Sequence, residues 1–423
     1  MKTPDELRKE FWEEDISLRG GGVIYNQYCE IKDVIEKQDF SFPVRKLEEI
    51  KQYAKENVPF YRELSTFPVL TKGDILAHYE EHKSIGEYRK PIHISSTSGS
   101  TGTPFAVIQD YDKRMRNIAD LKVFGELCGY PSHERMVFFR VINSKLHRTP
   151  EIEEKENIYY IDSSDLGDEH LGQMISAVME KQPIIIFSYS STLIELAKYS
   201  LKNGLDPKSY PMKTVLTAGE GISEENRKMV EKAFGCPVYR RYSDMELGIL
   251  GQDNKNGSSY SLNWGSYYFE CLKIDKDEPA ENGEAGRIVI TDLFNKAFPL
   301  IRYDTGDLGI MEYSKDEMPK LKEIFGRVRD CVYTLDGRLV SPAKIFVTMW
   351  ETENVQQWQF IQEEQNYYVM RLNTSGIVDE EIIVNKFRNV LGEEANIVIE
   401  YVDEIPVQAS NKRRAVICNY KKG

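Results

Sequence analysis

Apolar residues near the N-terminus recur at the spacing of a helix. Ser41 and Pro43 are typical of a helix start, and a stripe of four apolar residues follows them: Val44, Leu47, Ile50 and Ala54. A second stripe repeats at every third residue and is followed by Gly129, a common helix terminator: Met115, Ile118, Leu121, Phe124 and Leu127. These patterns predict that residues 1–90 are mostly helical and that a further helix ends before Gly129.

From Met136 the pattern changes to short apolar runs that alternate with helical stripes. Strands are expected at 137–142, 184–187, 215–217 and 238–242. Helices are expected at 171–178, 193–201 and 229–234, the last with Ser223 as its N-cap and Gly235 at its end. Strand–helix alternation predicts a parallel sheet covered on both faces, with ligands bound beyond the carboxyl ends of its strands.

After Gly248 the helical spacing is lost, and the chain changes character again near residue 326. The runs at 267–274 and 286–291 predict antiparallel strands, and 299–307 is polar and turn-prone. Beyond 326, strands at 367–372 and 395–402 and a helix at 382–390 suit a small α+β domain. The predicted fold class is therefore α/β. A large N-terminal domain (1–325) combines a parallel sheet, helices and a β-rich subdomain, and a small C-terminal domain (326–423) follows it.

Composition narrows the class of protein. The chain has 423 residues, with 55 Lys and Arg against 68 Asp and Glu, which gives a net charge of −13 and argues against a nucleic-acid partner. Its 6 cysteines lie far apart and form no metal or redox motif, as in reduced cytosolic proteins. No apolar run approaches the length of a membrane span, and the charged N-terminus lacks the apolar core of a signal peptide. A cytoplasmic protein without a membrane span is expected.

The segment 95–104 is the strongest candidate for chemistry. It reads Ser-Ser-Thr-Ser-Gly-Ser-Thr-Gly-Thr-Pro, in which seven of ten residues carry hydroxyls. Hydroxyls and unhindered glycine amides together can surround a phosphate chain with donors. It is neither a Walker A loop nor a nucleophile elbow. A flexible Ser/Thr linker is the alternative, but such linkers rarely stand between apolar, periodic elements.

Two further segments carry acidic residues beside aromatic ones. In 302–307, Asp307 could accept two hydrogen bonds from vicinal ribose hydroxyls, although an Asp-rich turn is the simpler interpretation. In 240–246, at the end of a predicted parallel strand, Tyr242 could stack on a base and Glu246 could hold a divalent cation. A strand end with surface charges is an equal alternative there.

Two further candidates, a basic segment and a pair of histidines, also have simpler interpretations than a functional site. In 410–414, Lys412 could neutralise phosphate charge that develops in a transition state, or it could belong to a solvated basic tail. His78 and His82 stand four residues apart and could bind zinc, but a third ligand is not evident, and a solvated helix face is favoured.

In order and spacing, these segments resemble the adenylate-forming (acyl-activating) enzyme superfamily, and within it the phenylacetate–coenzyme A ligase and CapK-type group. The matching segments are 97–104 (phosphate loop), 218–220 (Ala-Gly-Glu), 242–246 (aromatic-x-x-x-Glu), 303–307 (Tyr-Asp-Thr-Gly-Asp), 326–330 (Gly-Arg-x-x-Asp) and 410–412 (Ser-Asn-Lys). Segments 58–61 and 67–72 also look like this group. The resemblance covers about residue 55 to the end, and 97–104 is its most specific part.

The resemblance implies a role for each matching residue. The nucleotide-binding set is Ser98, Gly99, Ser100, Thr101, Gly102, Ala218, Gly219, Glu220, Tyr242, Ser243, Asp307 and Arg327. Of these, the residues of 98–102 would hold phosphates, Tyr242 would stack on adenine and Asp307 would hold the ribose. Glu246 would bind Mg²⁺ and act in catalysis, and Lys412 would bridge the carboxylate and the α-phosphate. Asp330 would be the hinge of a mobile C-terminal lid.

The implied reaction has two steps, with ATP and Mg²⁺ as cofactors. A small carboxylic acid attacks the ATP α-phosphate to give an acyl-adenylate and pyrophosphate, a step that needs positioning and charge stabilisation but no covalent nucleophile. The acyl group then passes to coenzyme A, a carrier-protein thiol or an amine. Tyr189, Ser190 and Ala218 are expected beside the acyl pocket, and an aromatic or other planar acid is favoured. CapK-type relatives suggest a role in polysaccharide or natural-product biosynthesis.

Four residues depart from the superfamily's pattern: Phe105, Met245, Asp304 and Asn411, although phenylacetate-type ligases also commonly lack the lysine at the first of these positions. Phe105 stands where many members carry lysine, and Asp304 replaces an arginine. Met245 and Asn411 leave open a second hypothesis, a degenerate homologue that binds nucleotide without turnover. A scaffolding solenoid is disfavoured because the chain has no internal repeats.

Overall fold

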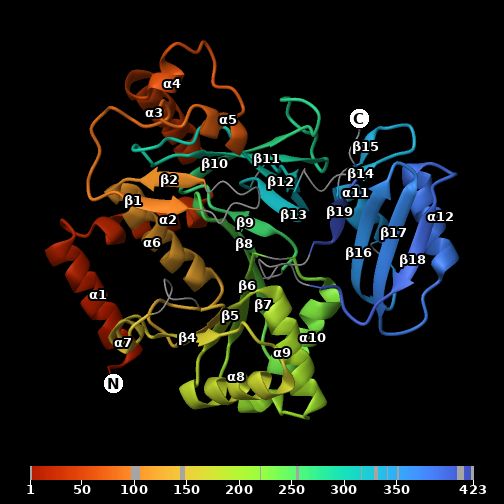
Figure 1. Cartoon of the computed structure of the whole chain (residues 1–423). Helices are drawn as coiled ribbons and strands as arrows, with labels where there is room; N and C mark the ends of the chain where they lie inside the picture. Colours follow the sequence, from red (N-terminus) through yellow and green to blue (C-terminus); the bar gives the residue numbers. More distant parts are fainter. Residues whose placement is uncertain are drawn as a thin grey trace.

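Figure 1 presents the computed structural model of the chain. The structure describes residues 2–96, 105–142, 148–219, 221–253, 257–315, 317–327, 332–340, 342–349, 352–406 and 414–420. Its mixed α/β class agrees with the prediction. The first 90 residues hold helices α1 (Pro4–Leu18), α2 (Val23–Lys37), α3 (Ser41–Asn57), α4 (Pro59–Arg62) and α5 (Lys72–Ala77).

A single large sheet organises most of the chain, with strand order β10-β11-β12-β13-β9-β8-β7-β6-β5-β3-β4. One half is parallel, as predicted. Its strands are β3 (Met136–Arg140), β4 (Ile158–Asp162), β5 (Ile185–Ser188), β6 (Thr214–Ala218) and β7 (Val238–Asp244). Of these, β4 was missed from the sequence.

Alternate residues of the parallel strands face opposite sides of the sheet. Val137, Ile186 and Val215 are register partners and enter one core cluster, whereas the neighbouring Ile185 and Leu216 enter another. The first cluster is covered by α8 (Asp168–Lys181), α9 (Ser190–Lys202) and α10 (Glu224–Phe234). These helices lie together at the bottom of Figure 1, and α6 (Tyr111–Leu127) lies on the other side of the strands. The sheet is therefore buried on both faces, as strand–helix alternation predicts.

The other half of the sheet is antiparallel. Its strands are β8 (Gly248–Asp253), β9 (Tyr260–Leu262), β10 (Tyr267–Leu272), β11 (Ala285–Asp292), β12 (Tyr303–Glu312) and β13 (Lys320–Arg327). The predicted pair β10 and β11 is confirmed. The interpretation of 299–307 as a turn is wrong from Tyr303 onward, because β12 pairs with both β11 and β13. The strand was missed because its polar residues do not show the apolar pattern on which the prediction depends.

Smaller elements complete the chain. A hairpin of β1 (His93–Ser96) and β2 (Ala106–Gln109) was not predicted, and α7 (Pro150–Glu156) follows β3. A separate four-stranded sheet, β18-β17-β16-β19, stands beside the rest in Figure 1. It comprises β16 (Val355–Glu364), β17 (Tyr367–Thr374), β18 (Ile397–Tyr401) and β19 (Val416–Cys418), with α11 (Pro342–Met349), α12 (Glu380–Leu391) and the short strands β14 (Val332–Tyr333) and β15 (Leu339–Val340). The domain boundary at 325/326 stays a prediction.

Helix α6 buries most of its predicted apolar stripe, with the exception of Leu121, and it buries charged residues as well. Leu121 is 53% exposed, whereas Lys113, Arg116 and Asp120 are fully buried. The face that packs carries Met115 together with small and aromatic residues. The apolar pattern did not indicate the buried charges: Lys113 forms an ion pair with Asp292, and Arg116 donates to Ser266.

His82 also contradicts the sequence-based interpretation. It is fully buried and its ring stacks between Phe60 and Phe298, whereas His78 is half exposed beside Glu81. Neither residue lies within α5, which ends at Ala77. The pair is therefore neither a solvated helix face nor a zinc site.

The helices in the described ranges lack the combined length and hydropathy that crossing a bilayer requires.

The unequal burial of the apolar stripe of α6 predicts unequal effects of truncation. Met115→Ala should lower the free energy of unfolding by about 2–5 kcal/mol, because it opens a cavity in the core. Leu121→Ala on the same helix should change it by only about 0.5 kcal/mol or less. Urea unfolding of both variants checks this, and an equal loss in the two would contradict the assigned face.

Candidate active site

The predicted acyl-pocket residues lie at the carboxyl edge of the parallel strands. Tyr189 follows β5 directly and Ser190 begins α9, while Ala218 ends β6. The Ser190 and Thr217 hydroxyls are 2.8 Å apart, so the ends of the two neighbouring strands are linked. Gly219 continues from β6 with φ of +79°, a backbone conformation that favours glycine. The sheet thus brings these residues together as the pattern of alternation predicted.

Tyr242 and Asp307 meet across the sheet. Tyr242 lies on β7 and its hydroxyl donates to the Asp307 carboxylate on β12 at 2.9 Å. Burial, together with the charges of Asp307 and Asp244, raises the pKa of Tyr242 well above its usual value, so the hydroxyl stays protonated and remains a donor. The Tyr242 residue is 8% exposed. On β13, Arg327 is the register partner of Asp307, so their backbones face each other.

The turn between β7 and β8 carries the acidic residue of the predicted metal site. It consists of Met245, Glu246 and Leu247, and Asp244 closes it by accepting the Leu247 amide at 2.6 Å. Ser243, from the predicted nucleotide set, lies on β7 directly before Asp244. Burial first, and then the neighbouring Glu246 carboxylate, raise the pKa of Asp244 well above its usual value. Acidic side chains are therefore close together at this edge of the sheet, and the ionised form of Asp244 is disfavoured.

Both ends of the predicted phosphate loop adjoin the same turn. Before the loop, the Ser95 hydroxyl of β1 donates to the Met245 carbonyl at 2.5 Å. After it, Phe105 is fully buried with its ring 6.1 Å from that of Tyr303, whose hydroxyl lies 3.5 Å from the Glu246 carboxylate. The described residues on both sides of 97–104 are consequently connected to the turn that carries Glu246.

Several predicted residues lie outside the described residues: Ser98, Gly99, Ser100, Thr101, Gly102, Glu220, Asp330 and Lys412. Their roles stay predictions, as do those of the residues that the structure describes.

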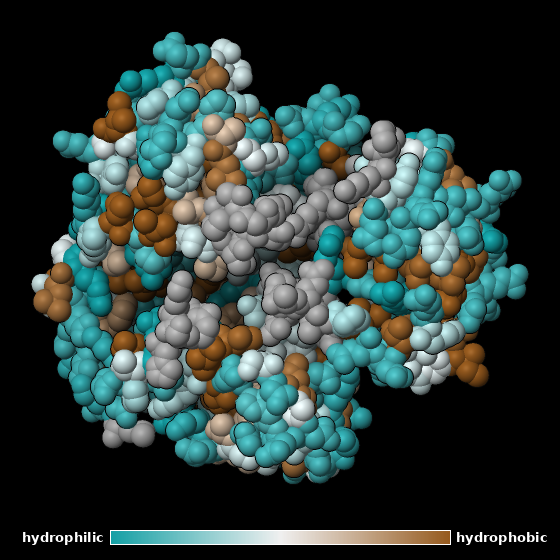
Figure 2. Space-filling model, viewed as in Figure 1, coloured by the Kyte–Doolittle hydropathy of each residue, from teal (hydrophilic) through white to brown (hydrophobic). Residues whose placement is uncertain are grey.

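Figure 2 shows the face of the molecule with α8–α10 below and α3–α5 above, where hydrophobic patches are scattered among hydrophilic surface.

Asp304 and Tyr303 have roles that sequence reasoning missed. Asp304 pairs with Arg287 at 2.7 Å and accepts the Gly306 amide at 2.8 Å, which fixes the bend just before Asp307. Its replacement of the family arginine is thus matched by an arginine on β11. The only signal in the sequence was that Tyr303 and Asp304 both lie within the 303–307 motif. The partner of Asp304 is Arg287 on β11, and no local pattern connects the two.

The carboxylates at the turn fit Mg²⁺ bound jointly with a nucleotide. Mg²⁺ in such sites takes one or two protein carboxylates and completes its shell with water and phosphate oxygens. Glu246, next to Asp244, supplies oxygen donors of that kind. Within the part of the chain that the structure describes, no group of three or more His, Cys, Asp or Glu residues is arranged to hold a metal without such help.

Comparisons with known proteins agree with this geometry. The family profile described as "CapK C-terminal domain" matches residues 332–419. The chain is 25% identical to Protein CapK of Staphylococcus aureus, over 93% of this chain and 92% of that protein. It is 23% identical to phenylacetate-coenzyme A ligase of Escherichia coli, over 78% of each chain.

Solved structures share the fold. For 2-hydroxyisobutyryl-CoA ligase in its postadenylation state, in complex with 2-HIB-AMP, the TM-score is 0.64 at 18% identity, over 89% of this chain and 88% of that one. For ATP-bound MatB of Rhodopseudomonas palustris it is 0.54 at 15% identity, over 76% and 66%.

The class of fold follows from these likenesses: the chain has the fold of the adenylate-forming ligases. Within that class it is similar to CapK and to the phenylacetate–coenzyme A ligases, the group that its motifs indicated.

The raised pKa of Asp244 predicts that an asparagine there stabilises the fold at neutral pH. The folded protein holds this proton more tightly than the unfolded chain, so the wild type loses stability as pH rises above about 4. Asp244→Asn removes that loss and keeps an acceptor for the Leu247 amide. Urea unfolding should give equal stabilities near pH 4 and a more stable variant at pH 7.

Exposed Asp168, changed to Asn, is the matched control and should lack this pH-dependent gain. A difference between Asp244→Asn and wild type that is the same at both pH values would contradict the assignment.

Proposed function

We propose that the protein is an ATP- and Mg²⁺-dependent carboxylate ligase that forms an acyl-adenylate, releases pyrophosphate and passes the acyl group to coenzyme A. The observation that supports it best is the Tyr242–Asp307 hydrogen bond, which joins β7 to β12 beside Glu246. Residues 65 positions apart thereby form one acidic, partly buried edge next to the ends of a phosphate-type loop.

Asp307 is the proposed ribose acceptor. Its carboxylate is fixed by the Tyr242 hydroxyl and by the bend at Gly306, so it needs little reorganisation when vicinal hydroxyls arrive. Tyr242 would contact adenine through the small part of its surface that is open. Gly219, Ala218 and Ser243 would line the same space at the carboxyl edge of β6 and β7.

In the first step, a carboxylate oxygen of the acid forms a bond to the α-phosphorus, and the bond from that phosphorus to the bridging oxygen breaks. Pyrophosphate leaves with that oxygen and its electron pair. Lys412 would stabilise the negative charge on the α-phosphate, and the hydroxyls and amides of 98–102 would hold the leaving phosphates. Mg²⁺ bound at Glu246 would neutralise part of the phosphate charge.

Coenzyme A is the proposed acceptor because the relatives of this chain include enzymes named as coenzyme A ligases. A carrier-protein thiol or an amine remains the alternative. The acid would lie beside Tyr189 and Ser190, and an aromatic or planar acid suits the tyrosine. The biosynthesis of a polysaccharide or natural product is the proposed setting.

A panel of aryl, acyl and amino acids tests the function. Pyrophosphate should be released only with ATP, Mg²⁺ and the correct acid, and Lys412→Ala should reduce this release by about 10²–10³-fold while ATP still binds. Lys202→Ala, at an exposed surface pair, is the control. Tight ATP binding without pyrophosphate exchange for any acid would instead support the degenerate homologue.

The ribose assignment predicts a selective defect in Asp307→Asn. The asparagine keeps an acceptor for Tyr242 but loses the charge, so ATP affinity should fall by about 10–100-fold, the range of a charged hydrogen bond. Wild type should bind 2′,3′-dideoxy-ATP more weakly than ATP, whereas the variant should discriminate little between them. Unchanged discrimination, measured by calorimetry, would reject the role of Asp307.

A further inference from the structure

The turn that carries Glu246 is held through three successive carbonyl groups. The Ser95 hydroxyl donates to the carbonyl of Met245, the Gln109 side-chain amide donates to that of Glu246 at 3.2 Å, and the Tyr267 hydroxyl donates to that of Leu247 at 2.6 Å. The three donors come from β1, β2 and β10, which are distant in sequence. Every residue of the turn is therefore fixed by a different element.

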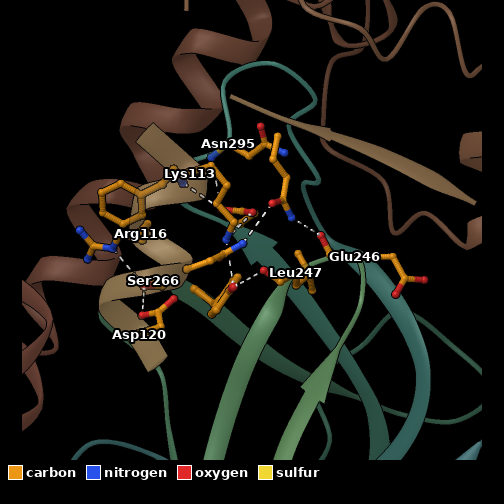
Figure 3. Close-up of polar contacts among 12 residues, drawn as sticks. Lys113, Arg116, Asp120, Glu246, Leu247, Ser266 and Asn295 are labelled. Atoms are coloured by element: carbon orange, nitrogen blue, oxygen red, sulfur yellow. Dashed lines mark hydrogen bonds and ion pairs between the residues drawn. The ribbon is translucent and has the colours of Figure 1, made fainter. Parts of the chain in front are cut away.

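Two of these donors belong to a buried polar network. The Tyr267 hydroxyl accepts from Lys113 at 2.9 Å, and Lys113 forms an ion pair with Asp292 at 2.8 Å; all three residues are at most 1% exposed. Gln109 accepts from Asn117 at 3.1 Å and is 2% exposed. Figure 3 shows Lys113 projecting from α6 towards the side chains that lead to Leu247 and Glu246.

The backbone beside the turn leaves no room for these groups to shift. Gly248 has φ of +123°, and a Cβ there would lie 3.1 Å from the Asn117 amide oxygen and 3.2 Å from the Tyr267 hydroxyl. Glycine is thus required for two reasons, conformation and close approach. The network and the turn are built as one packed unit.

Burying charged groups of this kind is a poor way to gain stability, because desolvation offsets most of the attraction between them. Apolar side chains of similar size would fill the same space. Polar donors are needed, however, where backbone carbonyls must be held in one orientation. The three donors hold three successive carbonyls, so the network serves to fix the conformation of the turn.

From this geometry we infer that Tyr267 and Gln109 are positioning residues for Glu246, which hold its carboxylate in the orientation that binds Mg²⁺. The inference rests on the proposed function. β1 precedes the loop and β2 follows it, so Ser95 and Gln109 tie both of its ends to the turn. A turn held in one conformation keeps the carboxylate ready for a metal shared between Glu246 and nucleotide phosphates.

Calorimetry of ATP binding, in Mg²⁺ and in EDTA, separates positioning from a general effect on the fold. Tyr267→Phe and Gln109→Met each remove one donor with little change in volume. Each should weaken ATP binding in Mg²⁺ by about three- to tenfold, the equivalent of one hydrogen bond, and leave binding in EDTA within about twofold.

The matched control is Tyr368→Phe. Tyr368 is also fully buried, and its hydroxyl donates to a backbone carbonyl, that of Tyr333, at 2.6 Å. It should leave both affinities unchanged. If Tyr267→Phe fails to fold, Gln109→Met and Ser95→Ala carry the same test.

A double-mutant cycle tests whether the loss of ATP affinity in Tyr267→Phe acts through Glu246. In a Glu246→Gln background, Tyr267→Phe should cause no further loss of Mg²⁺-dependent affinity. Equal losses in Mg²⁺ and EDTA, or losses that add to that of Glu246→Gln, would overturn the inference and leave the proposed function standing. Wild type that binds ATP equally well with and without Mg²⁺ would instead reject the proposed metal site, and the inference with it.

Discussion

The reversal of chain direction after β7 is the constraint on which the candidate site depends. β3 to β7 run parallel and end at one edge, and β8 then turns back and begins the antiparallel half of the same sheet. The turn must be tight, so its residues lie at the edge where the parallel strands end. The antiparallel half in turn brings Asp307 within hydrogen-bonding distance of Tyr242. Nucleotide chemistry is proposed at the point where the two halves meet.

The site concentrates features that oppose stability. Asp244 lies beside Glu246 with a raised pKa, and Tyr242 holds its hydroxyl against the Asp307 carboxylate in a largely buried position. Behind the turn, Lys113 and Asp292 are buried as an ion pair. A protein selected for stability alone would have little use for such groups, whereas a site that must orient phosphate and metal needs fixed polar atoms.

The sequence predicted the parts of the fold that follow from simple periodicity. The strands near 185 and 215 and the helix capped by Ser223 were found because apolar spacing and capping residues identify them locally. β12 was missed because its start is polar and lacks the apolar alternation of a strand, although it pairs with both of its neighbours in the chain. The buried charges of α6 were missed because no local rule indicates that Lys113 has a partner on β11.

The candidate site was predicted from motifs, but the hydrogen bonds that hold it together were not. Tyr242, Glu246 and Asp307 were selected as separate segments, and the structure brings them to one edge. Gln109 and Tyr267 carry no motif, since their importance comes from which carbonyl each one reaches. Such residues are identified only by the hydrogen bonds that they make in the folded structure.

A crystal structure of the protein with Mg²⁺ and a non-hydrolysable ATP analogue tests the central claim most directly. The account predicts ribose hydroxyls within hydrogen-bonding distance of Asp307, adenine beside Tyr242 and the phosphates next to Glu246. A nucleotide bound elsewhere, with Asp307 and Tyr242 untouched, would contradict it.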